Sequence, residues 1–574
     1  MSITRRADAS PLAADAVAGI TDPALAKIVG DHWEYMMWWA PTYATTLGDH
    51  RYDDRMARRD AASRAEARDE RDRLIARLVA LDPSSLDPTD RDTYHLLRGQ
   101  LEASRGGDVC RFDEWSVDPY TASPLAELSY LVESHVVNNA DDARNVLARL
   151  AQGATLIDDT IANLRLGLAD GLVAAQGKVV RAIAQLDEEL AKPRETWSLV
   201  TPAWAAQYPD LAHELREVVD ATIAPALARL RDYYRDDVLV HARVDFEGLY
   251  GLPDADTYYR AAILIHVGLA LAPKDLHALG LAEIARTDRE LAELGRRVLG
   301  TSDLASTIAK LRGDPELYFA TRDQILDAAQ TALDRAKAAI PRFFSVLPKT
   351  DCIMRETPAY EAPYSTVAYY RQPHYDGSKP GEYFVNTYKP ETRARFEMEA
   401  LTWHESIPGH HLQIAIAQEL GALPAFRKLD GSTSYVEGWA LYTERLADEM
   451  GLYTSDMDRL GKLSFDAWRA SRLVVDTGIH SLGWSRANAE AFMREHTALT
   501  EINISNEVDR YIGWPGQALA YKVGQIEIVR LRALAEKQLG AKFDLMGFHE
   551  VVLGAGAVTL PVLANRVQAW IQGR

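Results

Sequence analysis

The sequence predicts a mainly helical protein, and three observations lead to this prediction. Apolar residues recur at three- and four-residue spacing along most of the chain, for example over residues 145–168 and 275–299. Segments with the alternation of strands are few. Hydrophobic residues make up 47% of the 574 residues, which is enough to bury a large core. We therefore expect a large helical fold in which any sheet is small.

The helical pattern divides into two parts. Proline- and glycine-containing breaks interrupt it at 191–197, 245–259 and 312–319. We expect a helical N-terminal part over residues 1–250 and a second helical part over residues 251–574. No linker of low complexity separates them, so we expect one interlocked unit.

Two strands are predicted in the second part. Residues 364–370 (YSTVAYY) and 382–388 (EYFVNTY) are rich in β-branched and aromatic residues, and the turn-forming DGSKPG (376–381) lies between them. A small sheet is therefore expected within residues 364–388.

Charge and cysteine content limit the partners and the compartment. The 64 basic and 83 acidic residues give a formal net charge of -19, which argues against a nucleic-acid or anionic-membrane partner. Only Cys110 and Cys352 occur, too few for a disulfide framework or a thiolate metal cluster. The N-terminus lacks the apolar run of a signal peptide. We expect a cytoplasmic protein, and the sequence leaves its oligomeric state open.

Residues 403–413 (WHESIPGHHLQ) begin like the zinc-binding helix of a metallopeptidase. In the motif H-E-x-x-H, two histidines four residues apart share one helical face with the glutamate beside them. His404 and Glu405 supply the first half of this motif. The second histidine is then His410 or His411, six or seven residues after the first, and neither spacing works on an undistorted helix.

The two residues before these histidines favour a distortion. Pro408 removes an amide donor and clashes with the carbonyl of residue 404, and Gly409 permits an unusual backbone. A bulge of two residues would return His410 to the place of a standard second ligand. His411 is the alternative ligand, and otherwise we expect it beside the site.

The next helix offers a third ligand. Residues 432–450 contain Glu437 and Glu444 on nearly the same face among large apolar residues, and a buried carboxylate is costly unless it is paired or bound to a cation. A catalytic zinc ion keeps three protein ligands and an open position. We predict a zinc site formed by His404, His410 and Glu437, with Glu444 orienting a histidine from behind.

Five separated motifs carry a resemblance to a known family. The chain resembles, along nearly its whole length, the bacterial family called domain of unknown function 885, through PTYATTLGDHRYDDR (41–55), HESIPGHHLQ (404–413), YVEGWALYTE (435–444), RLVVDTGIHSLGWSR (472–486) and PGQALAYKVG (515–524).

This family is similar in turn to the helical gluzincin peptidases of the thimet oligopeptidase type. That similarity implies a metallopeptidase-like fold with the site in a deep cleft beside the small sheet. Their motif HEFGH aligns with Gly409 and His410 here, with two residues inserted, and their later glutamates match Glu437 and Glu444.

A hydrogen-bond donor is expected for the oxyanion that peptide hydrolysis forms. The segment 510–530 provides candidates, and the resemblance favours Tyr521, with Tyr511 and His480 as alternatives. A tyrosine packed in the core is an equally good interpretation of any one of them.

Further residues are assigned to the surroundings of the site. Tyr383, Val385 and Asn386 lie on the strand 383–387, which we expect to pair with an extended peptide as an added edge strand. Arg472 is a further substrate-binding candidate. Asp476 joins Glu444 and His411 as a residue expected behind the ligands.

Taken together, these features predict a zinc metallopeptidase of short peptides in which Glu405 acts as the general base. A metal-dependent amidase of a non-peptide substrate would use the same chemistry. A non-catalytic helical binding protein with a degenerate site is the alternative from another class. The natural substrate, and cleavage within or at the ends of peptides, are left open.

Overall fold

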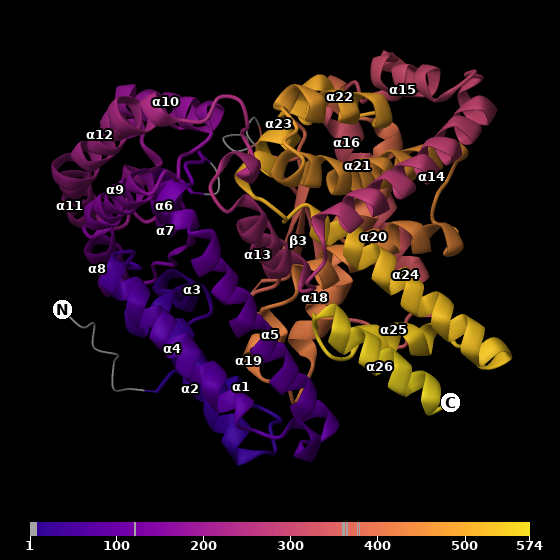
Figure 1. Cartoon of the computed structure of the whole chain (residues 1–574), viewed down its shortest axis with the longest axis horizontal. Coiled ribbons are helices and arrows are strands. Elements are labelled where there is room, and N and C mark those ends of the chain that lie inside the picture. The colour runs from indigo at the N-terminus through magenta and orange to yellow at the C-terminus, as the bar shows by residue number, and fades with distance from the viewer. Residues whose placement is uncertain (1–8, 120–121, 359–361, 363–364, 376, 378) are drawn as a thin grey trace. The chain divides into compact units, whose positions relative to one another are not determined.

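The computed structural model describes residues 9–119, 122–358, 362, 365–375, 377 and 379–574 (Figure 1). Over these residues the chain is mainly helical with one small sheet, as predicted. It divides into two compact units, of which the first comprises residues up to Tyr258 together with Ile512–Trp514. The second comprises Tyr259–Tyr511 and Pro515–Arg574. The expected division at residue 250 lies close to the end of the first unit.

The first unit is built from helices around an apolar core. Its helices are α1 (Ala13–Ala16), α2 (Pro23–Trp39), α3 (Pro41–Thr46), α4 (Ala61–Val79), α5 (Pro88–Cys110), α6 (Phe112–Trp115), α7 (Pro124–Ser134), α8 (Ala140–Leu150), α9 (Gly153–Ala169), α10 (Gln176–Ala191), α11 (Pro209–Val218) and α12 (Ala224–Tyr233). Asp22 and Asp87 each cap a helix that begins with proline, by accepting hydrogen bonds from backbone amides of the first turn. Trp197, Leu215 and Leu230 are among its fully buried core residues.

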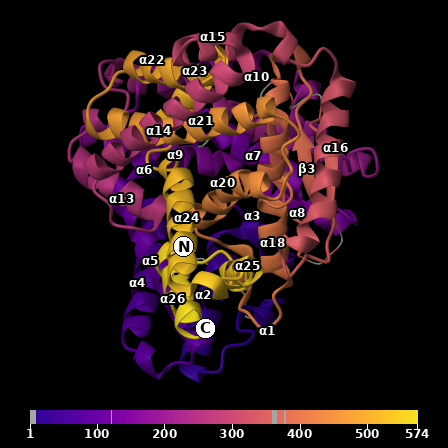
Figure 2. The same cartoon turned by 90° about the vertical axis from the view of Figure 1, so that its right-hand side faces the viewer.

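The second unit holds the longer helices, and the division between the units falls within α13 and α23. The helices are α13 (Ala255–Val267), α14 (Pro273–Leu299), α15 (Leu304–Gly313), α16 (Arg322–Ala339), α17 (Met398–Glu405), α18 (His410–Glu419), α19 (Ala425–Leu429), α20 (Thr433–Glu449), α21 (Asp456–Ser481), α22 (Arg486–His496), α23 (Glu501–Gly513), α24 (Leu519–Leu539), α25 (Leu545–Leu553) and α26 (Leu560–Gln572). Helix α21 lies along α14 and also packs against α17, α20 and α24 (Figure 2). The motif helix α17 is thereby held by three neighbours, α16, α20 and α21.

One three-stranded sheet lies beside α16 and α17. Its strands are β1 (Cys352–Glu356), β2 (Ala368–Arg371) and β3 (Gly381–Val385), in the order β1-β3-β2. β3 pairs antiparallel with β2 and parallel with β1. The predicted strand pair is confirmed as β2 and β3, whereas β1 was not predicted. Tyr364, Asp376 and Ser378 of the predicted strand and turn lie outside the described residues.

The sheet order corrects one prediction about substrate binding. β3 is the central strand, so both of its backbone edges are already paired. The segment 383–387 therefore cannot accept a peptide as an added edge strand, and that prediction is wrong. The edges of this sheet belong to β1 and β2.

Helices α20 and α24 pack closely because glycines stand at their crossing. A β-carbon on Gly524 would lie 1.7 Å from the carbonyl oxygen of Ser434, and one on Gly438 would lie 2.6 Å from the Gly524 α-carbon. Any larger residue at either position would push the two helices apart. This contact brings the turn of α20 that contains Glu437 against the turn of α24 that contains Tyr521.

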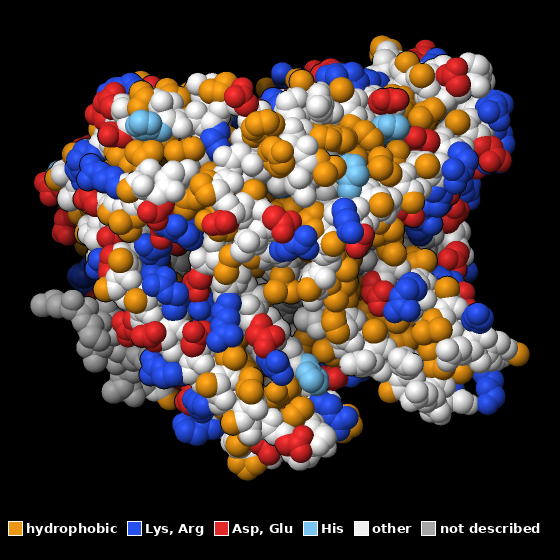
Figure 3. All heavy atoms as spheres, in the orientation of Figure 1, with side chains coloured by type: hydrophobic (Ala, Val, Ile, Leu, Met, Phe, Trp, Pro, Cys, Tyr) orange, Lys and Arg blue, Asp and Glu red, His pale blue; other side chains and the backbone are white. Residues whose placement is uncertain are grey.

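On the face drawn in Figure 3, acidic and basic side chains are interspersed, as on an ordinary solvated surface. Among the described residues, none of the helices combines the length and apolarity that a membrane crossing requires.

Candidate metal centre

The predicted helix distortion is a complete break. Helix α17 ends at Glu405, α18 begins at His410, and residues 406–409 form a turn between them. We had expected a bulge of two residues within a continuous helix. The break has the same effect on His410, because it frees the second histidine from the helical spacing that would have turned it away from His404.

Close packing explains the residues of this turn. A β-carbon on Gly409 would lie 2.0 Å from the carbonyl oxygen of His404, so only glycine fits where the chain folds back on α17. The peptide bond between Ile407 and Pro408 is cis. The carbonyl of Pro408 accepts a hydrogen bond of 2.9 Å from the indole of Trp439 in α20. The turn is thus anchored to the helix that carries Glu437.

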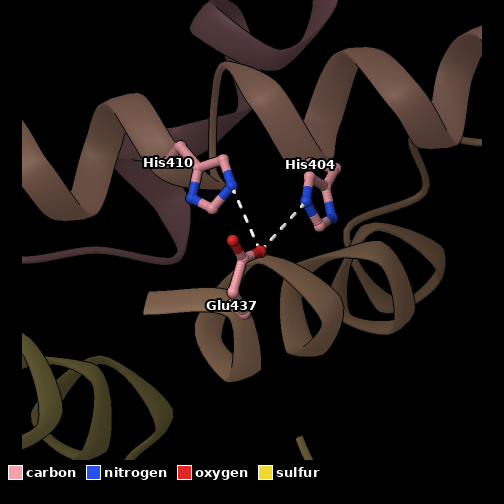
Figure 4. Close-up of side chains that lie close together, drawn as sticks. All are labelled: His404, His410 and Glu437. Carbon is pink, nitrogen blue, oxygen red and sulfur yellow. Dashed lines mark ion pairs between the residues drawn. The ribbon is translucent and has the colours of Figure 1, made fainter. Parts of the chain in front are cut away.

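Three predicted ligands meet across this turn (Figure 4). The Oε2 atom of Glu437 lies 3.7 Å from His404 Nε2 and 3.6 Å from His410 Nε2. Both distances are too long for hydrogen bonds, and that oxygen is buried without a hydrogen-bond partner among the described residues. One carboxylate oxygen and two imidazole nitrogens therefore face one another around a small gap.

The spacing suits a metal ion. Donor atoms bound to a tetrahedral zinc ion at about 2.1 Å lie about 3.4 Å from one another, close to the separations found here. Two imidazoles and one carboxylate are also a common ligand set of catalytic zinc. The residues present therefore fit a zinc ion, and a buried carboxylate oxygen without a partner is the observation that speaks for one.

Glu444 stands behind the first histidine, as predicted for it. Its Oε1 atom lies 2.8 Å from His404 Nδ1, and both side chains are buried. Since this contact occupies Nδ1, the Nε2 atom of His404 is the one that faces Glu437. The hydrogen bond fixes both the tautomer and the orientation of the ring.

The site is arranged to hold positive charge. Burial disfavours a charged His404, yet the carboxylates of Glu437 and Glu444 raise its pKa to about 9. Burial also disfavours a charged Glu437, but His404 and His410 lower its pKa to about 2. Burial raises the pKa of the neighbouring Glu405 to about 7. Two carboxylates thus favour a cation between them, either on His404 or in front of it.

His411 lies outside this group. Its Nδ1 atom is 2.9 Å from the hydroxyl of Tyr370 in β2, and its Nε2 atom is 3.1 Å from the carbonyl oxygen of Thr350. Both ring nitrogens are therefore engaged next to the sheet. The alternative in which His411 is the second ligand is wrong for this geometry, and so is its expected place behind the ligands.

Tyr521 is set up to donate a hydrogen bond. Its hydroxyl oxygen accepts a bond of 3.0 Å from Arg510 Nη2, and Arg510 also binds the amide oxygen of Gln517. We find no acceptor for the proton of the Tyr521 hydroxyl within the described chain. That proton is therefore available to a bound group.

The alternatives to Tyr521 are engaged in the core. The Tyr511 hydroxyl donates to Glu507 at 2.6 Å and accepts from Arg472 and Trp468. His480 Nε2 lies 2.9 Å from the backbone carbonyl oxygen of Tyr511. Both residues are at most 1% exposed. Their contacts are those of packing residues, so Tyr521 is the best of the three candidates.

Asp476 was expected behind a ligand, and this expectation is wrong. Its carboxylate accepts a bond of 2.5 Å from the Tyr259 hydroxyl and one of 3.1 Å from the Gly516 amide. Burial raises its pKa to about 7. Asp476 therefore stabilises the turn that precedes α24.

The strand residues serve the sheet. The Tyr383 hydroxyl bonds Thr402 at 3.1 Å, and the Asn386 amide donates to the carbonyl oxygens of Ala362, Ser365 and Thr366. Val385 is fully buried and pairs with Ala368 of β2. The contacts of these three side chains hold the sheet together and join it to α17.

Arg472 is buried and binds Glu507, and sequence reasoning missed the residues around it. Arg469 lies one turn earlier on the same helix, with Nη2 at 4.0 Å from Glu444 Oε1. Arg510 and Glu507 complete this group. Two arginines one helical turn apart, Arg469 and Arg472, directly before the apolar residues 473–475 were the available signal.

Fold and site together define a mainly helical protein with a candidate His-His-Glu metal centre. Over residues 41–567 the chain matches the family described as bacterial protein of unknown function (DUF885), and it belongs to this family. The predicted resemblance to this family is thus confirmed. No curated protein matches the chain.

Among the solved structures that are similar to this chain are two named as putative lipoproteins. The "putative lipoprotein" from Colwellia psychrerythraea has a TM-score of 0.89 at 26% identity, covering 96% of this chain and 100% of its own. A "putative lipoprotein of unknown function" from Shewanella oneidensis has a TM-score of 0.75 at 21% identity, covering 94% of this chain and 98% of its own. These likenesses concern the architecture of nearly the whole chain.

Proposed function

We propose that this protein is a zinc-dependent hydrolase that cleaves peptide bonds of short peptides. The observation that carries the proposal is the Glu437 oxygen, which faces the Nε2 atoms of His404 and His410 at coordination rather than hydrogen-bond separations. The glutamate next to the first histidine, Glu405, completes the residues of a metallopeptidase motif.

The residues of the site have distinct roles in this proposal. His404, His410 and Glu437 hold the ion, which when bound supplies Lewis acidity to water and to a carbonyl group. Glu405 takes a proton from the attacking water and returns it to the leaving amine. Tyr521, whose hydroxyl proton has no acceptor among the described residues, donates to the oxyanion.

The choice of short peptides rests on the resemblance of residues 404–413 and 435–444 to the motifs of helical gluzincins of the thimet oligopeptidase type, a relationship that is itself part of the proposal. Such proteins enclose the site in a deep cleft that excludes folded substrates. The ligand helices here are buried on most sides, which supports the same preference: His404 and His410 are 3% and 8% exposed.

Removal and return of the metal tests this function. We expect purified protein to hydrolyse a mixture of short peptides, to lose the activity after dialysis against a strong chelator, and to regain it with one equivalent of zinc. Folded casein-sized proteins should be cut far more slowly. Hydrolysis that survives complete removal of the metal, or zinc-loaded protein that cuts no peptide, would contradict the proposal.

The compartment is part of the proposal as well. Cys110 and Cys352 are both buried free thiols, which is compatible with a reducing cytoplasm. The relatives of known structure carry the name lipoprotein, which would instead favour a membrane-anchored form. Fractionation of cells that produce the native gene product separates the two, and recovery in the membrane fraction would overturn the cytoplasmic location.

A further inference from the structure

Two buried arginines stand one helical turn apart on α21. Arg469 is 4% exposed and Arg472 is 2% exposed. Both guanidinium groups lie over the indole of Trp468, at 4.1 Å and 4.7 Å from its ring centre. Fully buried guanidinium groups are rare in proteins unless they are paired. The contacts of these two arginines therefore show whether they are paired within the protein or are left for a ligand.

Several of their donor groups have no partner. Within the described chain, no acceptor meets the Nε and Nη1 atoms of Arg469 or the Nη1 atom of Arg472. Arg472 does bind Glu507 at 2.9 Å and the Tyr511 hydroxyl at 3.1 Å. The ion-pair partner of Arg469 is Glu444 at 4.0 Å, beyond hydrogen-bond reach. A buried donor that makes no hydrogen bond costs about 1–3 kcal/mol. We therefore expect an acceptor to bind here, either permanently or together with the substrate.

The carboxylates near the two arginines leave these donors unfilled. The charge of Arg469 acts on the buried Glu397 and Glu405 as well as on Glu444, yet its Nε and Nη1 atoms meet no acceptor in the described chain. Glu507 lies between Arg472 and Arg510, at 2.9 Å and 3.6 Å, and neutralises only one of the two. Glu444 is hydrogen-bonded to His404 and is therefore shared with the metal centre. Burial lowers the pKa of Arg469, the Glu444 carboxylate opposes this, and the charge of Arg472 adds to it. An acceptor with a negative charge beside Arg469 would fill these donors with charge-assisted hydrogen bonds.

This group adjoins the candidate metal centre. Arg469 is connected to His404 through Glu444, by contacts of 4.0 Å and 2.8 Å. Arg472 lies over the ring of Tyr521 at 4.3 Å from its centre. The two arginines thus touch the residue behind a metal ligand on one side and the candidate oxyanion donor on the other.

We propose that Arg469 and Arg472 bind the C-terminal carboxylate of the peptide substrate, so that the enzyme removes fragments from the C-terminal end of peptides. This inference rests on the proposed function and names its substrate class. The guanidinium fork matches the two oxygens of a carboxylate. In the reaction, water adds its hydroxyl group to the acyl carbon and its proton to the leaving amine, which yields a shortened peptide and a C-terminal fragment.

The test compares peptides that differ only at the C-terminus. A set of short quenched fluorescent peptides is prepared once as free acids and once as C-terminal amides. For zinc-loaded wild-type protein we expect kcat/KM to be about 100-fold higher for the acids, the loss seen when a buried charge pair loses one partner. Mass spectrometry should place each cut near the C-terminus.

Two substitutions make the test specific. Arg469→Met should reduce the preference for acids to near unity without lowering Tm, because it removes donors that have no partner in the protein itself. A purely structural arginine would instead lower Tm. Arg459→Met is the matched control, since Arg459 is on the same helix but is half-buried and paired with Asp448. It should keep the full preference.

A free inorganic anion would fill the same arginine donors as the carboxylate of a peptide. Titration with chloride distinguishes these two ligands. If chloride activates hydrolysis of acids and amides alike, and Arg469→Met abolishes this activation, the site holds a free anion and the carboxylate assignment is wrong. Competitive inhibition by chloride of the acids alone supports the assignment.

Failure of the subsite and failure of the peptidase function give different results. If acids and amides are cut equally, the peptidase function stands and the subsite is wrong. If zinc-loaded protein cuts neither, calorimetric titration with N-acetyl-dialanine and its amide decides the subsite. Binding of the acid alone, lost in Arg469→Met, would support it, and no binding of the acid would overturn it.

Discussion

His404 Nδ1 and Glu444 Oε1 lie 2.8 Å apart in a buried contact between α17 and α20. The contact settles which nitrogen of the ring faces the other ligands, because Nδ1 is occupied and Nε2 points toward Glu437 (Figure 4). A carboxylate in this place also increases the basicity of the ring as a ligand.

Replacement of Glu444 should therefore weaken zinc binding without removing a ligand. We expect Glu444→Gln to lower zinc affinity about 10-fold and Glu444→Ala up to about 100-fold. Competition with a chromophoric chelator measures both. Glu449→Gln is a suitable control, because Glu449 lies on the same helix and pairs with Arg532 at the surface. Wild-type affinity in both Glu444 variants would show that the contact serves only packing.

Glu405 should separate metal binding from catalysis. Since it acts on water and not on the ion in our account, Glu405→Gln should keep the zinc content and lower the turnover number by at least about 100-fold. Elemental analysis and a peptide assay on the same preparation give both numbers. Loss of zinc together with activity would make Glu405 a ligand, and wild-type rates would remove it from the mechanism.

Tyr521→Phe removes one hydroxyl group from a ring that stays packed beneath Arg472. We expect zinc content and Tm to change little and the turnover number to fall by about 10- to 1000-fold, as when one oxyanion donor is deleted. Tyr511→Phe serves as the comparison, because its hydroxyl satisfies Glu507 in the core. A fall in Tm that matches the fall in activity would assign Tyr521 to the core instead.

Because Asp476 is buried, the stability of the protein should depend on pH. Burial raises its folded-state pKa to about 7, above the usual value of an unfolded aspartate near 4. Between these values the folded state binds the extra proton, so the free energy of unfolding falls as pH rises from about 4 to about 7. Below about pH 4, the raised pKa of Asp476 adds an amount of the order of 4 kcal/mol to the free energy of unfolding.

Asp476→Asn keeps an acceptor for Tyr259 and Gly516 but cannot titrate. Relative to wild type, the variant should gain stability steadily as pH rises from about 4 to about 7, and the difference should level off above pH 7. Urea unfolding of both proteins across this range measures it. A difference that does not vary with pH would show that Asp476 is not protonated in the folded protein.

The meeting of His404, His410 and Glu437 could be predicted because its signals are local in sequence. His404 and Glu405 are adjacent in sequence. The Pro408-Gly409 pair predicts the interruption of the helix that allows His410 to lie next to His404. Glu437 could be found from a buried helix that contains a carboxylate. The chemistry of a zinc ligand then selected these residues among many others.

The errors arose where long-range packing decides. Strand β1 joins β3 in parallel after a long excursion of the chain, and its residues, Cys352–Glu356, show no alternation that announces a strand. Because β1 was not predicted, β3 was expected to be an edge strand of the sheet. Asp476 and Arg469 lie on the same helix, α21, which packs against α17, α20 and α24. Asp476 binds the turn at Gly516, whereas Arg469 lies near Glu444, and this difference depends on the packing of the helices.

Zinc titration of three single variants tests the central claim most directly. Metal-free wild-type protein should bind about one zinc ion per chain, and so should His411→Ala, since both His411 nitrogens are engaged by Tyr370 and Thr350. His410→Ala and Glu437→Ala should lose tight binding. Wild-type protein that binds no zinc, or binding that depends on His411 and not on His410, would contradict the account.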